Sequence, residues 1–184
     1  MKKEITEQDS ILLQSLANVS LLAELSNNDF LNSSYFHELK FKNKYFKEIL
    51  ILSGIGNPAM MQMMLYSLLV VVKEILSGEV NHDLDQDISR INKLMAELTE
   101  EDTYSTYNKE SKKKDINYFK HIRNAVAHSN CKYITENQKN YVIFFDKYNK
   151  KECIIKIECN KVGILLEELQ KLIIRWCDYN MKSN

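Results

Sequence analysis

The sequence predicts one mainly α-helical domain over residues 1–184, an antiparallel helical bundle with a β-hairpin inserted before the last helix. Three observations lead to this fold class. Apolar residues recur at three- and four-residue steps through most of the chain, two short segments late in the chain show β-type patterning, and only four glycines and one proline interrupt the 184 residues. A chain of this length buries roughly 70% of its unfolded surface on folding, so one apolar core is enough.

The first expected helix starts at Thr6-Glu7-Gln8-Asp9, a helix-start pattern, and continues to about Leu25. Its buried stripe consists of Ile11, Leu12, Leu16, Val19, Leu22 and Leu25. Polar residues from Ser26 to Ser34 interrupt this periodicity. A shorter helix is then expected between Phe36 and Leu52.

The strongest break in the sequence is Gly54-Ile55-Gly56-Asn57-Pro58, where the asparagine can cap a helix and the proline can occupy its first turn. A long helix, apolar nearly all round, is expected from there to about Ser77, with Gly78 as its stop. Its methionines are interpreted as core residues rather than copper ligands. An amphipathic helix with an acidic outer face is expected from Asp83 to Leu98.

The last part of the chain combines helices with the hairpin. Asp115 is expected to cap a helix that ends soon after His128. Tyr141–Phe145 and Glu152–Glu158 are expected to form two strands, joined by a polar turn from Asp146 to Lys151. Asn160 is expected to cap the final helix.

The charge balance limits how the protein can bind polyanions. Twenty-five Lys and Arg residues match twenty-five Asp and Glu residues, which argues against binding to nucleic acid or membranes through overall positive charge. Locally the charges separate, because Glu79–Asp102 has eight acidic and two basic residues whereas Lys109–Arg123 has six basic and two acidic residues. Contact with RNA would therefore need a local patch.

A cytoplasmic location without membrane contact is expected. The N-terminal residues mix charges and lack the continuous apolar segment of a signal peptide. The longest nearly apolar run, Ala59–Val72, would reach only about 21 Å as a helix, which is short of a bilayer core. The four cysteines are expected to be reduced thiols.

The segment His121–Ser129 is where strongly polar side chains interrupt an apolar helix. Asn124 and His128 lie four residues apart on one stripe, and Arg123 lies roughly 140° from His128 and about 7.5 Å away along the axis. A long arginine side chain can span that gap. Both groups can then border one cavity, in which Asn124 can orient the imidazole or a neighbouring strand of backbone.

Such a pair has the chemistry for RNA cleavage without a metal ion. An imidazole that titrates near neutrality can take a proton from a 2′-hydroxyl, and a permanently charged guanidinium can stabilise charge on phosphorus. Because one imidazole does not easily serve as both base and acid, a symmetric dimer would supply the second one. The same spacing is also compatible with a surface ion pair at Arg123 and an ordinary helix-terminal His128.

The segment Arg123-Asn124, followed by three residues and His128, resembles the signature of the HEPN superfamily. That signature is an arginine, a polar residue and a histidine after four to six intervening positions, late in a helix of a helical domain. The segment Gly56–Tyr66 and the hairpin after His128 resemble a bacterial plasmid- and defence-associated HEPN branch. The resemblance spans roughly residues 54–176.

The resemblance implies a helical domain that often forms homodimers and cleaves RNA without a metal ion in a cleft shared by two copies. Many relatives are toxins or antiviral effectors, so an antitoxin or regulatory protein is an expected partner. By the same resemblance Arg123 stabilises the transition state, His128 acts as base or acid, and Asn124 has a positioning role. An alternative is a non-catalytic module that binds RNA, a nucleotide or a partner protein.

One position departs from a regulated branch of the superfamily. Where a nucleotidyltransferase antitoxin regulates the HEPN protein, a tyrosine stands two positions after the motif histidine. This sequence has Asn130 at that place, and Tyr133 is the nearest alternative. Regulation by tyrosine AMPylation is therefore not expected.

A basic rim is expected to draw RNA toward the cleft, although a solvated loop explains the same lysines equally well. The rim candidates are Lys112, Lys113, Lys114, Lys120 and Lys132. His121 is either a supporting phosphate ligand or a plain surface residue. Tyr104 and Tyr107 are candidate stacking rings, whereas Tyr118 is expected to pack in the core.

No cofactor or metal ion is expected. Cys153 and Cys159 fall on one face of a predicted strand about 20 Å apart, which is too far for one ion. Cys131 and Cys177 are isolated, and neither a C-x-x-C nor an H-x-x-x-H pattern occurs. Cys153 and Cys159 are interpreted as core thiols.

Overall fold

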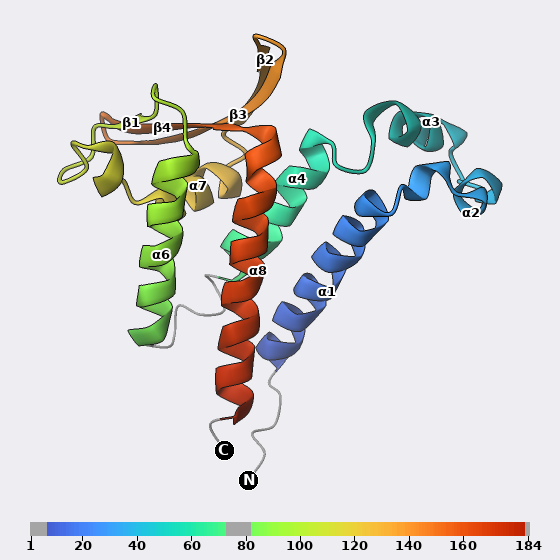
Figure 1. The fold of residues 1–184 in the computed structure, drawn as a ribbon, viewed down its shortest axis with the longest axis horizontal. Helices are drawn as coiled ribbons and strands as arrows, with labels where there is room; N and C mark the ends of the chain where they lie inside the picture. The colour runs from blue at the N-terminus through green and yellow to red at the C-terminus, as the bar shows by residue number, and fades with distance from the viewer. Residues whose placement is uncertain (1–6, 73–81, 183–184) are drawn as a thin grey trace.

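The computed structural model describes residues 7–72 and 82–182. Five helical segments lie against one another below a small antiparallel sheet, and the start of α1 and the end of α8 lie at the same end of the molecule (Figure 1). The segments are α1 (Glu7–Asn27), α4 (Pro58–Leu65) with the π-helix η2 (Tyr66–Val71), α6 (His82–Leu98), α7 (Tyr118–Ala127) and α8 (Cys159–Lys182). The expected mainly helical fold with a hairpin before the last helix is confirmed at this level.

The central apolar segment begins where the sequence predicts. Asn57 Oδ1 accepts a hydrogen bond from the backbone N–H of Met60 at 3.0 Å, and Pro58 occupies the first turn. After Leu65 the backbone changes to a π-helix, whose Leu68, Leu69 and Val70 are buried. The sequence does not predict this change. The expected end of the helix near Ser77 lies outside the described residues.

The sheet has four strands in the order β1-β4-β3-β2. The hairpin of β3 (Lys139–Tyr148) and β4 (Lys151–Glu158) confirms the two predicted strands, whereas β1 (Tyr104–Ser105) and β2 (Cys131–Glu136) are not predicted. β1 is only two residues long, and β2 has a polar composition. Neither strand therefore carries an alternating apolar pattern that identifies it locally.

The predicted turn from Asp146 to Lys151 is too long. The chain reverses within two residues, Asn149 and Lys150, whose φ angles of 47° and 64° are those of a tight hairpin turn. Asp146 consequently lies in β3, opposite Cys153 of β4, and is buried. The longer β3 places the Asp146 carboxylate under the sheet instead of in solvent.

Two predicted helix starts are wrong by one or more residues. Asp115 ends a short 3-10 turn, η3 (Lys113–Asp115), and α7 is capped by Asn117, whose side chain accepts from the N–H of Lys120 at 3.1 Å. The buried Ile116 is extended and separates the two turns, so Asp115 cannot reach the helix. At the other end of the sheet, α8 begins at Cys159, one residue before the expected cap.

The helix expected between Phe36 and Leu52 is two helices, α2 (Ser34–Glu38) and α3 (Lys44–Ser53). Ser33 caps the first and Asn43 caps the second, so each start carries its own side-chain hydrogen bond. None of the residues of α3 is buried. In Figure 1 α2 and α3 project to one side of the helices that form the core.

One apolar core joins the helices to the sheet. It includes Leu12 of α1, Leu68 of η2, Ile91 of α6, Ile155 of β4 and Leu169 of α8, all nearly inaccessible to solvent. Met64 and Met95 belong to it, in agreement with the interpretation of methionine as core, while Met63 is exposed.

Over the described ranges 7–72 and 82–182, no single helix is both long and apolar enough to cross a membrane. Lys44–Ser53 and Pro58–Val71 meet the length and composition criteria only when taken together, and they are bent by 90°.

Replacing Asn57 by alanine is expected to destabilise the whole domain, because the cap holds a helix that enters the core. The loss is about 1 kcal/mol in the free energy of unfolding. Asn43→Ala is the matched control, since it removes the same type of cap from α3, which buries no residue. Urea unfolding followed by circular dichroism measures both, and equal losses would contradict the different contributions of α3 and α4.

Candidate functional site

The three motif side chains come from the last turns of α7, which packs against β3. Arg123 and Asn124 are half-buried, and His128 is exposed as the residue that ends the helix. The structure therefore places two of the predicted catalytic residues partly under the sheet and the third at the solvent edge.

The position of His128 is fixed by the backbone around it. Its N–H donates to Asn124 O at 3.1 Å, and Ser129 takes a left-handed conformation with φ of 54°. Asn130 N–H then donates back to Ala125 O at 2.8 Å, and Asn130 O accepts from Phe145 N–H of β3 at 2.9 Å. This is a Schellman-type helix end tied to a strand.

Asn124 links the motif to the sheet. Its Nδ2 donates to Asp146 Oδ2 at 2.9 Å, and its Oδ1 accepts from Nη2 of Arg123. The sequence predicts that Asn124 orients the imidazole or a neighbouring backbone strand, whereas its hydrogen-bond partners are a carboxylate and the guanidinium. Because both ends of the amide are engaged, Asn124 fixes Arg123 relative to β3.

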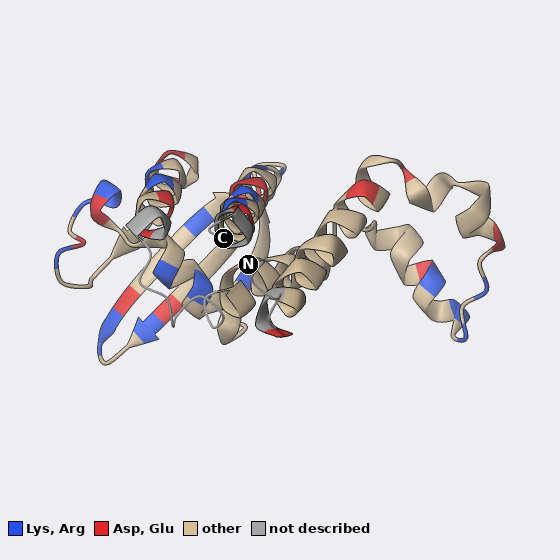
Figure 2. Ribbon diagram, turned by 90° about the horizontal axis from the view of Figure 1, so that it is seen from below, with Lys and Arg blue, Asp and Glu red and all other residues tan. Residues whose placement is uncertain are grey.

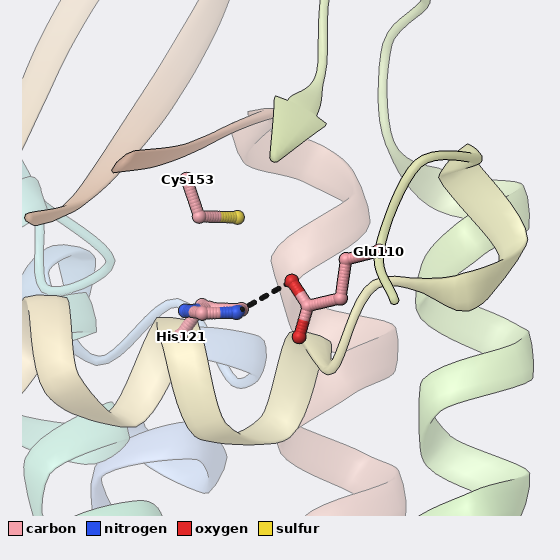
Figure 3. A group of neighbouring side chains, drawn as sticks. All are labelled: Glu110, His121 and Cys153. Atoms are coloured by element: carbon pink, nitrogen blue, oxygen red, sulfur yellow. Dashed lines mark hydrogen bonds and ion pairs between the residues drawn. The ribbon is translucent and has the colours of Figure 1, made fainter. Parts of the chain in front are cut away.

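His121 lies on the other side of the same carboxylate. It is completely buried, its Nδ1 lies 2.6 Å from Asp146 Oδ2, and its Nε2 lies 2.9 Å from Glu110 Oε2. Figure 3 shows the contact with Glu110 and the thiol of Cys153 above it. Each ring nitrogen therefore has a carboxylate oxygen within hydrogen-bond distance.

The sequence predicts an exposed or phosphate-binding His121, and the structure gives it a different place. A fully buried ring leaves no edge on which to hold a phosphate. Its contacts make it a positioning residue for Asp146, which in turn holds Asn124.

Tyr107 covers this group from the loop before α7. Its ring centroid lies 4.7 Å from that of His121, and Lys120 Nζ lies 5.2 Å from the Tyr107 ring. Burial, with the nearby Asp146 carboxylate as a smaller cause, raises the pKa of the Tyr107 hydroxyl. Tyr118 is fully buried, as the sequence predicts, whereas Tyr104 is exposed and donates to Glu152 Oε1 at 2.6 Å.

The predicted basic rim is only partly assembled. Lys112, Lys114, Lys120 and Lys132 are exposed, but Lys113 is half-buried and its Nζ donates to Thr99 O at 2.6 Å. Figure 2 shows basic and acidic positions interspersed along the strands and helices rather than gathered on one basic face.

The cysteines are free thiols. Burial raises the pKa of Cys131 to about 11 and that of Cys153 to about 12, so both are protonated near neutrality. Cys159 is the first residue of α8 and not part of a strand, which corrects its predicted place. Burial also raises the pKa of Tyr133 to about 12.

Glu110 and Asp146 are residues of the candidate site that the sequence does not predict. Asp146 directly follows the apolar run Tyr141–Phe145 and was assigned to the turn, although a longer strand would have buried it. Glu110 lies in an irregular segment, and no local pattern reveals that it reaches α7. Glu110 is 11 residues from His121 along the chain, and Asp146 is 25 residues from it.

A family model described as HEPN pEK499 p136 matches residues 1–179. The chain belongs to this HEPN family. No curated protein and no solved structure matches the chain. The resemblance of residues 54–176 to the HEPN superfamily is thus confirmed, and the match extends over the N-terminal helices as well.

Replacing Asp146 by asparagine is expected to destabilise this HEPN protein by about 3 kcal/mol, because a buried charged partner of His121 is removed. Asp102→Asn is the control, since Asp102 makes an exposed ion pair with Lys156 at 3.2 Å, and less than about 1 kcal/mol is expected there. Guanidinium unfolding measures both. If both substitutions lower the free energy of unfolding by similar small amounts, Asp146 does not anchor α7.

Proposed function

We propose that the protein is a metal-independent endoribonuclease of HEPN type that acts as a toxin or antiphage defence effector. The observation that carries this proposal is the fixed Arg123, held through Asn124 on Asp146, on the same helix whose exposed end presents His128. A guanidinium in a set position and an accessible imidazole are the groups that transesterification of RNA needs.

The proposed reaction uses no group beyond these side chains and the RNA. A neutral His128 takes the proton of a 2′-hydroxyl, the 2′-oxygen attacks the adjacent phosphorus, and the bond to the 5′-oxygen breaks. Arg123 stabilises the negative charge that builds up on the phosphoryl oxygens. The products are a 2′,3′-cyclic phosphate and a 5′-hydroxyl end.

The leaving 5′-oxygen needs a proton from a second acid, and a second copy of the chain would bring another His128. The exposed apolar side chains of α3 support such a homodimer, because Tyr45, Phe46, Ile49 and Leu52 are each 40% exposed or more. Large apolar side chains on neighbouring turns of an exposed helix are typical of protein interfaces. RNA is the proposed substrate, and an antitoxin or regulatory protein is a further proposed partner.

Arg123→Ala and His128→Ala are each expected to lower RNA cleavage by at least about 100-fold, since each removes a group that acts in the transition state. Purified proteins are incubated with total RNA and EDTA, and the products are separated on a gel. Arg175→Ala and His37→Ala are matched controls, because Arg175 pairs with Asp87 on the surface and His37 is exposed on α2. Both controls are expected to cleave normally.

Cleavage that survives both motif substitutions would contradict the proposal. If the wild type leaves RNA intact but binds it, and the motif variants do not, the non-catalytic module is the correct function instead. Matched circular dichroism spectra show that the variants remain folded.

Phe46→Glu is expected to convert the proposed dimer into a monomer, because a charge on the exposed face of α3 opposes its burial. Size-exclusion chromatography with light scattering measures the mass. Ile174→Glu is the control, since Ile174 is an exposed apolar residue of α8, and the dimer is expected to persist. A wild-type monomer, or a dimer unaffected by Phe46→Glu, would contradict this interface.

A further inference from the structure

Three side chains with metal-binding chemistry meet between the sheet and α7. They are Glu110 from the loop between β1 and α7, His121 from α7 and Cys153 from β4, and one ligand atom of each lies within 4.8 Å of the other two (Figure 3). His121 and Cys153 are completely buried, and the Glu110 side chain is only 12% exposed. A thiol in the core usually packs against carbon, whereas this one faces an imidazole and a carboxylate.

We propose that Glu110, His121 Nε2 and Cys153 Sγ bind a zinc ion. Zinc takes carboxylate oxygen, imidazole nitrogen and thiolate sulfur at about 2.0–2.3 Å, in tetrahedral sites. The thiolate selects zinc over Mg²⁺ or Ca²⁺, which prefer sites made of oxygen alone.

Neighbouring groups are arranged as they are around zinc ligands. Asp146 Oδ2 lies 2.6 Å from His121 Nδ1, so the ring can donate there and leave Nε2 for the ion. The Ser105 hydroxyl donates to Glu110 Oε2 at 2.6 Å and thereby orients the ligating carboxylate. A water molecule or this hydroxyl would complete the fourth position.

Zinc binding would release the proton of the Cys153 thiol to solvent, because the thiolate is the form that binds the ion. The charge of +2 on the ion would then lie beside the thiolate and the carboxylate of Glu110, with the carboxylate of Asp146 behind the imidazole.

Small movements are enough to close the group around zinc. Tetrahedral coordination requires ligand atoms about 3.3–3.8 Å apart. The ligand atoms of the three residues now lie up to 4.8 Å apart, so the widest of these distances must shorten by about 1 Å. The distance of 2.9 Å between His121 Nε2 and Glu110 Oε2 must lengthen slightly. Glu110 lies in a loop, so its backbone can follow the ion more readily than β4 or α7.

The zinc site does not depend on the proposed ribonuclease activity. Its ligands lie across Asp146 from Asn124, and His128 is seven residues beyond His121, about 10 Å along the helix axis. The ion would tie the loop before α7 to the helix and to β4. Its role is structural, and the reaction at Arg123 and His128 does not pass through it.

The test measures metal in protein purified without an affinity tag that binds metal. Inductively coupled plasma mass spectrometry is expected to find one zinc ion per chain in the wild type and almost none in Cys153→Ala or Glu110→Gln. Cys177→Ala is the matched control, because it removes another buried cysteine from the core at α8, and it is expected to keep its zinc.

Cobalt substitution gives a second readout, in which the wild-type protein alone tests whether a thiolate binds the ion. Wild-type protein loaded with Co²⁺ is expected to show a thiolate-to-cobalt charge-transfer band, which Cys153→Ala lacks and Cys177→Ala retains. Wild-type protein that contains no zinc and shows no such band on titration would overturn the proposal. So would zinc that Cys153→Ala and Glu110→Gln keep at the wild-type level.

Discussion

The carboxylate of Asp146 is the point on which the site depends. One of its oxygens, Oδ2, contacts both His121 Nδ1 and Asn124 Nδ2, at 2.6 and 2.9 Å. These two partners lie on adjacent turns of α7, while Asp146 lies in β3. A single buried acceptor therefore sets both the rotation of the helix and its distance from the sheet, and the side chain of Arg123 takes its position from Asn124.

The two groups of the proposed reaction are held by different means. Arg123 is held by a side-chain network in which each polar atom needs its partner, because an unmatched buried polar atom is costly. His128 is held by the backbone, through the left-handed Ser129 and the hydrogen bonds of Asn130. Its ring stays exposed at the end of α7, where it can meet a substrate or a second copy of the chain.

Local patterns in the sequence predict much of the fold. The presence and approximate positions of α1, α6, α8 and the hairpin of β3 and β4 follow from periodicity, since each carries apolar residues at regular steps. Periodicity does not predict three other features, which are the break between α2 and α3, the short β1 and the polar β2. Contacts with distant residues stabilise them. The motif residues Arg123, Asn124 and His128 can be picked out as candidates from the sequence, since they lie within six residues of one another and resemble a known signature.

The residues that contact the motif from other parts of the chain could not be predicted, because these contacts also join distant segments. Glu110, Asp146 and Cys153 reach His121 from other segments, and no spacing along the chain reveals the meeting. The sequence predicts Asp146 in the polar turn, because it follows the apolar part of β3. The sequence predicts His121 as a phosphate ligand or a surface residue, yet it is completely buried, with a carboxylate on each side of its ring.

The central claim is that His128 and Arg123 act on the 2′-hydroxyl of RNA, and the most direct measurement is the chemistry of the cut ends. A short RNA that the protein cleaves would be compared by mass spectrometry with the same RNA carrying one 2′-deoxy residue at the cut site. The account predicts 2′,3′-cyclic phosphate and 5′-hydroxyl ends from the RNA and no cut at the deoxy position. Products with 5′-phosphate ends, or cleavage at the deoxy position, would contradict it.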